Sequence, residues 1–473
     1  MANIRDQCSW VHMHEKAGAT EKAKALVRMA VMNANNIKPL KDIMLDVNKK
    51  ALVVGGGMAG MTAALKLANQ NFEVFLIEQE DSLGGNLKHI FSTIDGLDVR
   101  SFMKETIERV DSHPLIHVET EAQIIDHTGF RGNFETGIEA GPLKKYKKIN
   151  HGIIVLATGG EEYKPNGMFL YGENEKVLTQ TELESQIISG RLPRYERVTM
   201  IQCVGSRNEA RPYCSRICCS TAIKNAITLK EQKPEADVVI LFRDIMTYGF
   251  LEKYYLKARR LGIRFVRFEK ANPPIVNNGN GVLAITCFDP FVTEEVSFTT
   301  DLLVLSCAIV PRDNEAIATL FKVPRTIDGF FLEAHMKLRP VDFPSDGMFL
   351  AGLCHSPKNI RESIAQAEAA VARGITILSK DQIAAGGVVA RVEPEKCAAC
   401  LTCVRVCPYS VPVINEKGDA EIDISKCKGC GICVAECPAG AIDLMHYRDA
   451  QIIGKAKSLF SEVTGDMVAE CES

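Results

Sequence analysis

The stretch ALVVGGGMAGMTAALKLANQNFEVFLIE, at residues 51–78, decides the fold. An apolar strand runs directly into Gly55-x-Gly57-x-x-Gly60, and these glycines open a helix. The helix leads to a second strand that ends on Glu78. This order predicts a βαβ unit of about thirty residues with the glycine fingerprint of dinucleotide binding. Gly55 permits a tight turn, Gly57 lets a pyrophosphate approach, and Gly60 lets the helix pack closely, while Glu78 suits an adenosine ribose.

Composition places the chain among ordinary globular proteins, with room for roughly two to four domains. Its 473 residues are 46% hydrophobic and 24% charged, and the formal net charge is -3. This charge argues against a dedicated binder of nucleic acid or of anionic membranes. No signal peptide is recognisable, and no apolar run approaches the ~18 residues that would span a bilayer. We therefore expect a cytoplasmic protein without a transmembrane segment.

Cysteine is the residue type that points to chemistry. The chain has 17 cysteines, and in a reducing compartment so many indicate metal ligation or redox work rather than disulfides. Twelve of them form two groups, at 203–219 and 397–437, and five are scattered: Cys8, Cys287, Cys307, Cys354 and Cys471.

Three short motifs favour FAD as the dinucleotide. A GG loop follows Glu78, an ATG motif ends a later strand, and the stretch GMFLAG resembles a late motif at the flavin. All three are typical of flavoproteins with two dinucleotide-binding domains. The residues concerned are Gly84, Gly85, Asn86, Ala157, Thr158, Gly159 and Gly352.

The late motif departs from its usual form. It normally continues with an aspartate that contacts the ribityl chain or the phosphate, whereas Leu353, Cys354 and His355 follow here. That contact must therefore be replaced or lost. Cys354 either lies near the flavin or is a small buried thiol.

The C-terminal cysteines predict a two-cluster ferredoxin domain of the bacterial type. The run C-x2-C-x2-C-x3-C-P occurs twice, with a period of 30 residues. In such runs three thiolates hold one [4Fe–4S] cube and the fourth cysteine crosses to the other cube. A zinc module is the alternative, although structural zinc sites use other spacings. One cluster is assigned to Cys397, Cys400, Cys403 and Cys437, and the other to Cys407, Cys427, Cys430 and Cys433.

The middle cysteines stand where a second nucleotide-binding loop is expected. The strand RVTMIQ at 197–202 and Gly205 are present, but the stretch CVGSRNEARPYCSRICC at 203–219 replaces a glycine motif. No CxxC dithiol is present there to act as a thioredoxin-reductase-like carrier. Arg207, Arg211 and Arg216 lie among the thiols and would favour thiolates. A zinc site or a set of structural cysteines is the alternative to a cluster.

The whole chain resembles the A subunit of heterodisulfide reductase, which is the flavin-containing subunit of electron-bifurcating complexes. The matching pieces are NIRDQCSWVH at 3–12, the FAD motifs, the middle cysteines, GLCHSPKNIRESIAQA and the terminal ferredoxin. The resemblance implies a [4Fe–4S] cluster close to the flavin, held by Cys203, Cys214, Cys218 and Cys219. It also implies that Lys224 approaches the flavin as a catalytic residue. The alternative for Lys224 is an exposed helix lysine.

The fold expected is α/β: a thioredoxin-reductase-like flavoprotein with two dinucleotide-binding domains, followed by an α+β two-[4Fe–4S] ferredoxin domain. A helical segment at 1–48 precedes the FAD-binding domain, which comprises 49–195 and 331–380. A second Rossmann-like domain at 196–330 carries the middle cluster. A linker at 381–394 leads to the ferredoxin domain at 395–446 and a tail at 447–473.

The chain departs from longer relatives in two ways. Those carry a cluster-bearing N-terminal domain, of which this sequence shows only the last portion, and Cys8 alone cannot hold a cube. Cys8 is therefore a remnant, or a partner chain supplies the other ligands. Residues 86–150 contain no cysteine. The ferredoxin module that long members insert in the FAD domain is therefore missing. In this shortened form the electron route differs or runs through partner subunits.

FAD and three [4Fe–4S] clusters together predict an electron-transfer subunit of a heterodisulfide-reductase-like complex. The resemblance implies flavin-based bifurcation, other subunits of the complex, a hydrogenase or dehydrogenase module as donor, and ferredoxin as a further partner. The resemblance is also compatible with a dimer within the complex. The alternatives are a self-sufficient NAD(P)H oxidoreductase, a one-electron relay without bifurcation, and a scaffold that only conducts electrons.

Overall fold

The computed structural model describes residues 1–40, 43–279, 282–385 and 387–460. Two compact units emerge. The larger is Asp46–Asp381, and the smaller combines Met1–Leu45 with the chain from Gln382 onward. Within the described ranges no helix has both the length and the apolar content that a bilayer crossing requires.

The first sheet of the larger unit is the expected dinucleotide-binding sheet. Its five strands are parallel and have the order β19-β8-β2-β3-β4. Val53 contacts the apolar core on one face and Leu52 the core on the other, as expected of a parallel sheet covered on both sides. The strands are β2 (Lys50–Val54), β3 (Glu73–Ile77), β4 (Ile116–Glu119), β8 (Ile153–Leu156) and β19 (Met348–Leu350).

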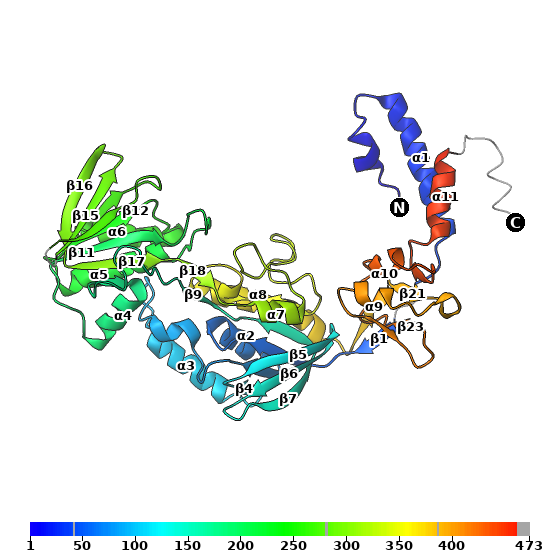
Figure 1. Cartoon of the computed structure of the whole chain (residues 1–473), viewed down its shortest axis with the longest axis horizontal. Helices are drawn as coiled ribbons and strands as arrows, with labels where there is room; N and C mark the ends of the chain where they lie inside the picture. The colour runs from blue at the N-terminus through cyan, green and yellow to red at the C-terminus, as the bar shows by residue number, and fades with distance from the viewer. Residues whose placement is uncertain (41–42, 280–281, 386, 461–473) are drawn as a thin grey trace. The chain divides into compact units, whose positions relative to one another are not determined.

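Helices cover one face of this sheet and an antiparallel layer covers the other (Figure 1). Ala367 and Ala370 allow α8 to pack closely on α2 and the sheet. Phe134 and Ile138 of the antiparallel layer contact the opposite face. The helices are α2 (Met58–Ala68), α3 (Val99–Asp111) and α8 (Ile360–Leu378), and the layer is β5 (Gln123–Phe130), β6 (Asn133–Ala140) and β7 (Lys145–His151).

The second sheet has five parallel strands in the order β10-β17-β11-β12-β13. Helices α4 (Gln180–Ser189), α5 (Cys218–Gln232) and α6 (Glu252–Arg260) share one core with it. The antiparallel strands β14 (Ile275–Gly279), β15 (Val282–Asp289) and β16 (Glu294–Thr300) lie on the other face. The sheet strands are β10 (Val177–Thr179), β11 (Arg197–Val204), β12 (Asp237–Phe242), β13 (Arg264–Arg267) and β17 (Leu302–Cys307).

The boundaries of the second domain differ from those expected at 196 and 330. Strand β10 already belongs to the second sheet, and helix α4 packs in the core beside that sheet. At the other end, Phe321 of α7 (Glu315–Phe321) packs in the core of the first domain. Strand β18 (Ile309–Pro311), which pairs with β9 (Gly160–Glu162), marks the crossing. A three-residue strand such as β10 shows no periodicity, so the sequence contains no signal for this boundary.

The ferredoxin part of the smaller unit reproduces the 30-residue repeat in its backbone. Leu401 and Gly431 both have positive φ, 63° and 80°, and both cap the start of a short helix. The expected linker at 381–394 is not structureless, because it contains β20 (Gln382–Ala385) and β21 (Ala390–Val392). The other elements are α9 (Thr402–Val406), β22 (Pro412–Ile414), β23 (Ala420–Ile422), α10 (Ile432–Ala435) and β24 (Ile442–Leu444).

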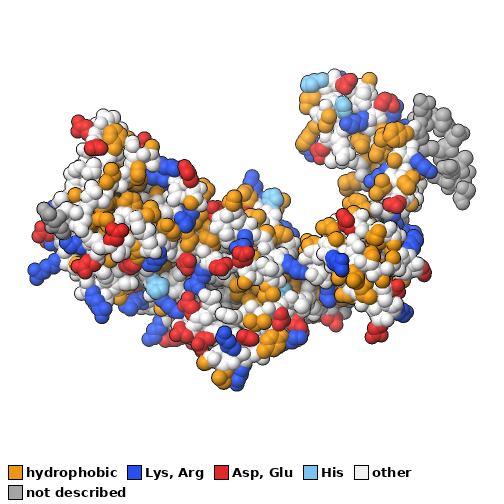
Figure 2. Space-filling view, viewed as in Figure 1, with side chains coloured by type: hydrophobic (Ala, Val, Ile, Leu, Met, Phe, Trp, Pro, Cys, Tyr) orange, Lys and Arg blue, Asp and Glu red, His pale blue; other side chains and the backbone are white. Residues whose placement is uncertain are grey.

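The two ends of the described chain pair in the smaller unit as helices α1 (Lys16–Asn35) and α11 (Asp449–Phe460). Gln451 Nε2 donates to Asn33 Oδ1 at 3.4 Å, and the tail beyond Phe460 lies outside the described residues. Hydrophobic side chains are exposed on this pair (Figure 2). Val31 and Ile453 are among them. Cys8 is buried beside it and its thiol donates to Ala19 O at 2.9 Å.

Candidate functional site

The glycine loop after β2 has the close contacts that only glycine allows. Gly55 has φ +108°, and a Cβ there would lie 2.3 Å from Ala157 O. A Cβ on Gly60 would lie 1.8 Å from Gly55 O. Gly57 caps α2, and the space beside it is open to 4 Å. A hollow at the N-terminus of an 11-residue helix suits a pyrophosphate, because backbone N–H groups and the helix dipole favour anions there.

Glu78 is held against this loop. Its side chain is buried, Oε2 accepts from the Gly56 N–H at 2.6 Å, and Oε1 accepts from the Glu80 N–H at 2.8 Å. Each carboxylate oxygen keeps a second lone pair that can accept from a ribose hydroxyl. The acidic residue predicted from the sequence therefore stands where an adenosine would be recognised.

The other predicted cofactor residues gather around the same loop. A Cβ on Gly85 would lie 3.3 Å from Gly57 Cα, so the GG loop passes close to the glycine loop. Asn86 Nδ2 donates to Gly160 O at 2.8 Å, which joins the GG loop to the ATG motif. Gly159 has φ +83° and open space beside it. These segments meet at the carboxyl ends of adjacent parallel strands, where α/β sheets bind ligands.

The late motif, which follows β19 and precedes α8, approaches the same site. A Cβ on Gly352 would lie 2.8 Å from Ala59 Cβ on α2. The Cys354 thiol is buried and donates to Ala351 O at 3.1 Å, and burial raises its pKa. The buried-thiol interpretation of Cys354 is therefore the one that the structure favours.

Lys358 is a buried cation that the sequence did not single out. Its Nζ donates to Gly352 O and Ser356 O, each at 2.8 Å, and burial lowers its pKa to about 8. The motif SPKN before the capped start of α8 was its only sequence signal. It places a positive charge on the backbone of the late motif.

The middle cysteines lie between the end of β11 and the first turn of α5. Cys203 has φ +63°, and strained backbone of this kind is common at functional sites. Burial, together with the thiols of Cys219 and Cys214, raises the pKa of Cys203 to about 11. A hydrogen bond from Cys218 to Cys219 raises the pKa of Cys218 and lowers that of Cys219. The four thiols are thus close enough to influence one another.

The three arginines of this loop have different partners. Arg207 pairs with Asp244 at 2.6 Å and lowers the pKa of the nearby Cys219 thiol. The Arg211 guanidinium lies over the Tyr163 ring at 4.2 Å. Arg216 reaches the α8 side and donates to Pro357 O at 3.2 Å. The expectation that all three balance the charge of the thiols is supported directly only for Arg207.

Lys224 is buried, so the exposed-lysine interpretation is wrong. Its Nζ lies 2.5 Å from Glu184 Oε1 and donates to Ser92 O at 3.0 Å. Burial lowers its pKa, and Glu184 partly opposes that shift. Asn225 Nδ2 donates to Gln180 Oε1 at 2.7 Å, which continues the polar network behind the pair. The lysine therefore contacts the segment that follows the GG loop.

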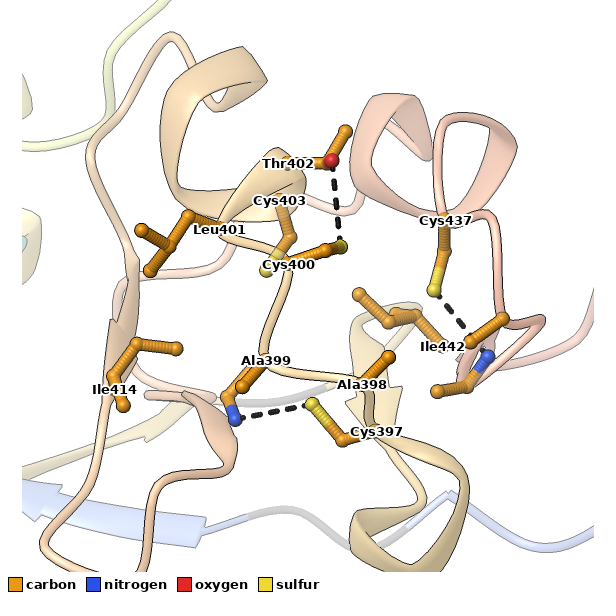
Figure 3. A pocket seen from close by; sticks show the side chains of 13 residues that line it. Cys397, Ala398, Ala399, Cys400, Leu401, Thr402, Cys403, Ile414, Cys437 and Ile442 are labelled. Carbon is orange, nitrogen blue, oxygen red and sulfur yellow. Dashed lines mark hydrogen bonds between the residues drawn. The ribbon is translucent and has the colours of Figure 1, made fainter.

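The first group of ferredoxin cysteines lines one small pocket (Figure 3). Backbone amides point toward the sulfurs: Ala420 N–H donates to Cys397 Sγ at 3.4 Å, and Ala441 N–H donates to Cys437 Sγ at 3.3 Å. Donors of this kind stabilise thiolates that ligate iron. Apolar side chains, including Ile414 and Ile442, complete the lining. The four thiols assigned to one cluster are Cys397, Cys400, Cys403 and Cys437.

The second ferredoxin group has the same features. Burial and the thiols of Cys427 and Cys407 raise the pKa of Cys433 to about 11. Gly429 N–H donates to Cys427 Sγ, and Val411 N–H donates to Cys407 Sγ, both at 3.5 Å. Across the described residues, no three His, Cys, Asp or Glu side chains converge closely enough for a single metal ion. Both ferredoxin groups offer thiolates with support from backbone amides, a donor set that fits an iron–sulfur cube.

Comparison with known proteins agrees with both parts of the chain. Residues 53–103 match the NAD(P)-binding Rossmann-like domain family, and residues 380–445 match the 4Fe-4S dicluster domain family. Among solved structures, T. acidophilum thioredoxin reductase is similar at a TM-score of 0.48 and 14% identity, covering 69% of this chain and 97% of its own.

Two curated relatives span most of the sequence. The A subunit of the H(2):CoB-CoM heterodisulfide,ferredoxin reductase of Methanothermobacter thermautotrophicus is 32% identical, over 98% of this chain and 84% of its own. An iron-sulfur A subunit of the CoB--CoM heterodisulfide reductase of Methanopyrus kandleri is 35% identical, over 88% of this chain and 78% of its own. The chain therefore belongs to the family of heterodisulfide reductase A subunits, which are iron–sulfur oxidoreductases.

Proposed function

We propose that the chain holds one FAD and three [4Fe–4S] clusters and passes electrons between them and partner subunits of a heterodisulfide-reductase-like complex. FAD exchanges electrons in pairs or singly, whereas each cluster exchanges one. The FAD-binding residues proposed are Gly55, Gly57, Gly60, Glu78, Gly84, Gly85, Asn86, Ala157, Thr158, Gly159 and Gly352. Open space beside Gly57 and Gly159 supports this assignment.

The middle cysteine loop carries the proposal. It occupies the strand-to-helix junction of the second Rossmann-like domain, where a nicotinamide dinucleotide would otherwise meet a glycine loop. Arg216 joins this loop to Pro357 and Glu362, next to the late motif of the FAD domain. A cluster held by Cys203, Cys214, Cys218 and Cys219 would therefore receive electrons beside the flavin. No hydride donor would be needed at this junction.

Lys224 is proposed as the catalytic residue that approaches the flavin. Its support is a buried side chain that leaves α5 and contacts Ser92 O in the FAD domain. A cation there would favour negative charge on the cofactor. Glu184 would keep the lysine charged, because a buried ammonium without a partner tends to lose its proton.

Partner subunits would supply the donor and the acceptor. The names of the relatives point to ferredoxin, hydrogen and a heterodisulfide as reactants of their complexes. By analogy we propose a hydrogenase or dehydrogenase module as donor and a flavin that bifurcates electron pairs. A one-electron relay is the alternative. An anaerobic redox titration separates them, because bifurcation requires the flavin to take both electrons in one step, and two well-separated steps would favour the relay.

Anaerobic mixing with NADH or NADPH tests the proposal as a whole. Without partner proteins we expect neither nucleotide to bleach the absorbance of the oxidised flavin, while dithionite bleaches it fully. Rapid bleaching by either nucleotide would instead favour a self-sufficient NAD(P)H oxidoreductase. Purified protein without any flavin would favour a conducting scaffold.

A further inference from the structure

The segment at 312–314, between β18 and α7, contains two buried N–H groups that have no partner. Arg312 Nε and Asn314 Nδ2 are both inaccessible to solvent and lack a hydrogen-bond acceptor among the described residues. The Asn314 side chain is 1% exposed. Buried donors are nearly always satisfied in folded proteins, so each of these calls for an explanation.

Both side chains are fixed by their other atoms. Arg312 Nη2 lies 3.1 Å from Glu80 Oε1, and the Thr158 hydroxyl donates to Asn314 Oδ1 at 2.8 Å. Asn314 occupies the cap position of α7 but makes no side-chain capping bond. The amide is therefore committed to Thr158, and its Nδ2 points elsewhere.

Strand order shows what this segment crosses. Glu80 follows β3 and Thr158 follows β8, and β2 lies between those two strands in the sheet. A segment anchored at both places passes the carboxyl end of β2, where the glycine loop and the N-terminus of α2 begin. This is the position at which a dinucleotide crosses such a sheet.

The charges around the segment suit a diphosphate. Arg312 and Lys88 both pair with Glu80, at 3.1 and 3.2 Å, so the three side chains together carry one excess positive charge. The late motif opposite lacks the aspartate that usually contacts the ribityl chain or phosphate, and the thiol of Cys354 is turned to backbone carbonyls. Asn314 is the donor nearer that motif, because its partner Thr158 also has a backbone hydrogen bond to Cys354.

We propose that Arg312 and Asn314 are FAD-binding residues that replace the missing aspartate contact. Arg312 Nε donates to the diphosphate, on the adenosine side near Glu80. Asn314 Nδ2 donates to the ribityl chain, on the flavin side near Thr158. This inference rests on the proposed FAD occupant.

The test uses the full chain, freed of flavin with its clusters intact, and isothermal titration with FAD and with ADP. Arg312→Lys keeps the charge and the pairing with Glu80 but removes Nε. Asn314→Leu keeps the size of the side chain and removes the Nδ2 donor without adding a charge. Arg260→Lys and Asn278→Leu, at exposed positions of the second domain, are the matched controls. Glu80→Gln asks whether Arg312 acts only through its ion pair.

We expect Arg312→Lys to weaken FAD and ADP alike by about tenfold, the loss typical of one donor to a charged group. Asn314→Leu is expected to weaken FAD by about tenfold and to leave ADP within about twofold. FAD binding by both variants at wild-type strength would overturn the inference. So would an effect of Glu80→Gln as large as that of Arg312→Lys. Wild-type protein that binds no FAD would instead overturn the proposed function.

A melting series guards against misfolded variants. The rise in Tm that saturating FAD produces is compared with each variant's own flavin-free Tm, so that altered basal stability cancels. A smaller rise for both variants than for their controls supports the inference, and an equal rise contradicts it.

Discussion

Arg216 Nη2 donates to Glu362 Oε1 at 2.6 Å, although the two residues lie 146 positions apart in the chain. Tyr248 OH donates to the same oxygen at 2.8 Å. The contact joins the loop of the middle cysteines to the first turn of α8, directly after the late motif of the FAD domain. This contact thereby links the proposed cluster site to the proposed flavin site.

Arg216→Gln should loosen both ends of this connection. We expect faster amide exchange at 205–217 and at 355–362, because the variant loses the charged partner of Glu362 and the bond to Pro357 O. Hydrogen exchange read by mass spectrometry measures it. Arg361→Gln, at the neighbouring position on α8, serves as control and should leave 205–217 unchanged. Equal protection of that loop in wild type and Arg216→Gln would contradict the connection.

Cys214→Ser should remove the middle cluster alone. Iron is expected to fall from ~12 to ~8 atoms per chain, on four-iron stoichiometry, while the ferredoxin clusters keep their EPR signals. Cys287→Ser is the control, since that buried thiol lies in the core of the second domain. Unchanged iron in Cys214→Ser would remove this residue from the ligand set.

Substitutions in the Lys224–Glu184 pair can distinguish a structural role of Lys224 from a role in electron transfer. Lys224→Met leaves a buried carboxylate without its cation and should destabilise the fold by about 3–5 kcal/mol. The double variant Lys224→Met/Glu184→Gln removes both charges and should recover most of that loss. Thermal melts measure stability, and the flavin potential reports the functional role. A double variant with the wild-type potential would show that Lys224 is structural.

An alanine side chain should be tolerated in the first ferredoxin repeat and destabilising at the equivalent position of the second. Ala399 and Gly429 occupy equivalent positions with φ of 50° and 64°. A Cβ on Gly429 would lie 2.1 Å from Val388 O, so Gly429→Ala should destabilise the domain by about 2 kcal/mol or more. Ala399→Gly should be close to neutral. Cluster absorbance during heating distinguishes the two, and equal melting of both variants would contradict the backbone geometry.

Two buried histidines should make the larger unit sensitive to acid. Burial lowers the pKa of His127 to about 4 and that of His151 to about 3. Both folded-state pKa values lie below the unfolded value of about 6.5. At any pH between a folded value and the unfolded value, the unfolded chain therefore binds more protons than the folded one. The stability that the two neutral histidines contribute to the fold is fully present above the unfolded pKa and is lost as the pH falls toward the folded values.

His127→Phe measures this contribution. Between pH 7 and pH 5 the wild type should lose about 2 kcal/mol through His127, and the variant should lose correspondingly less. Denaturant unfolding at both pH values gives the difference. An identical loss in the two proteins would show that His127 titrates normally.

The sequence was most informative where ligands or turns are local. The ferredoxin runs and the glycine loop place their residues within a few positions of one another, so spacing alone predicts their geometry. The burial of Lys224 depends on Ser92 and Glu184, which lie far away in the chain. Arg312 and Asn314 carry no motif, and only the strand order places them at the cofactor. Cys354 could not be assigned before its carbonyl partners were known.

The most direct test of the central claim, that a flavin and a third cluster share this chain, is anaerobic analysis of iron, sulfide and flavin combined with EPR. The account predicts one FAD and three clusters, or ~12 iron atoms, per chain. A value near ~8 iron atoms, with signals from the two ferredoxin clusters alone, would mean that the middle cysteines do not hold a cluster.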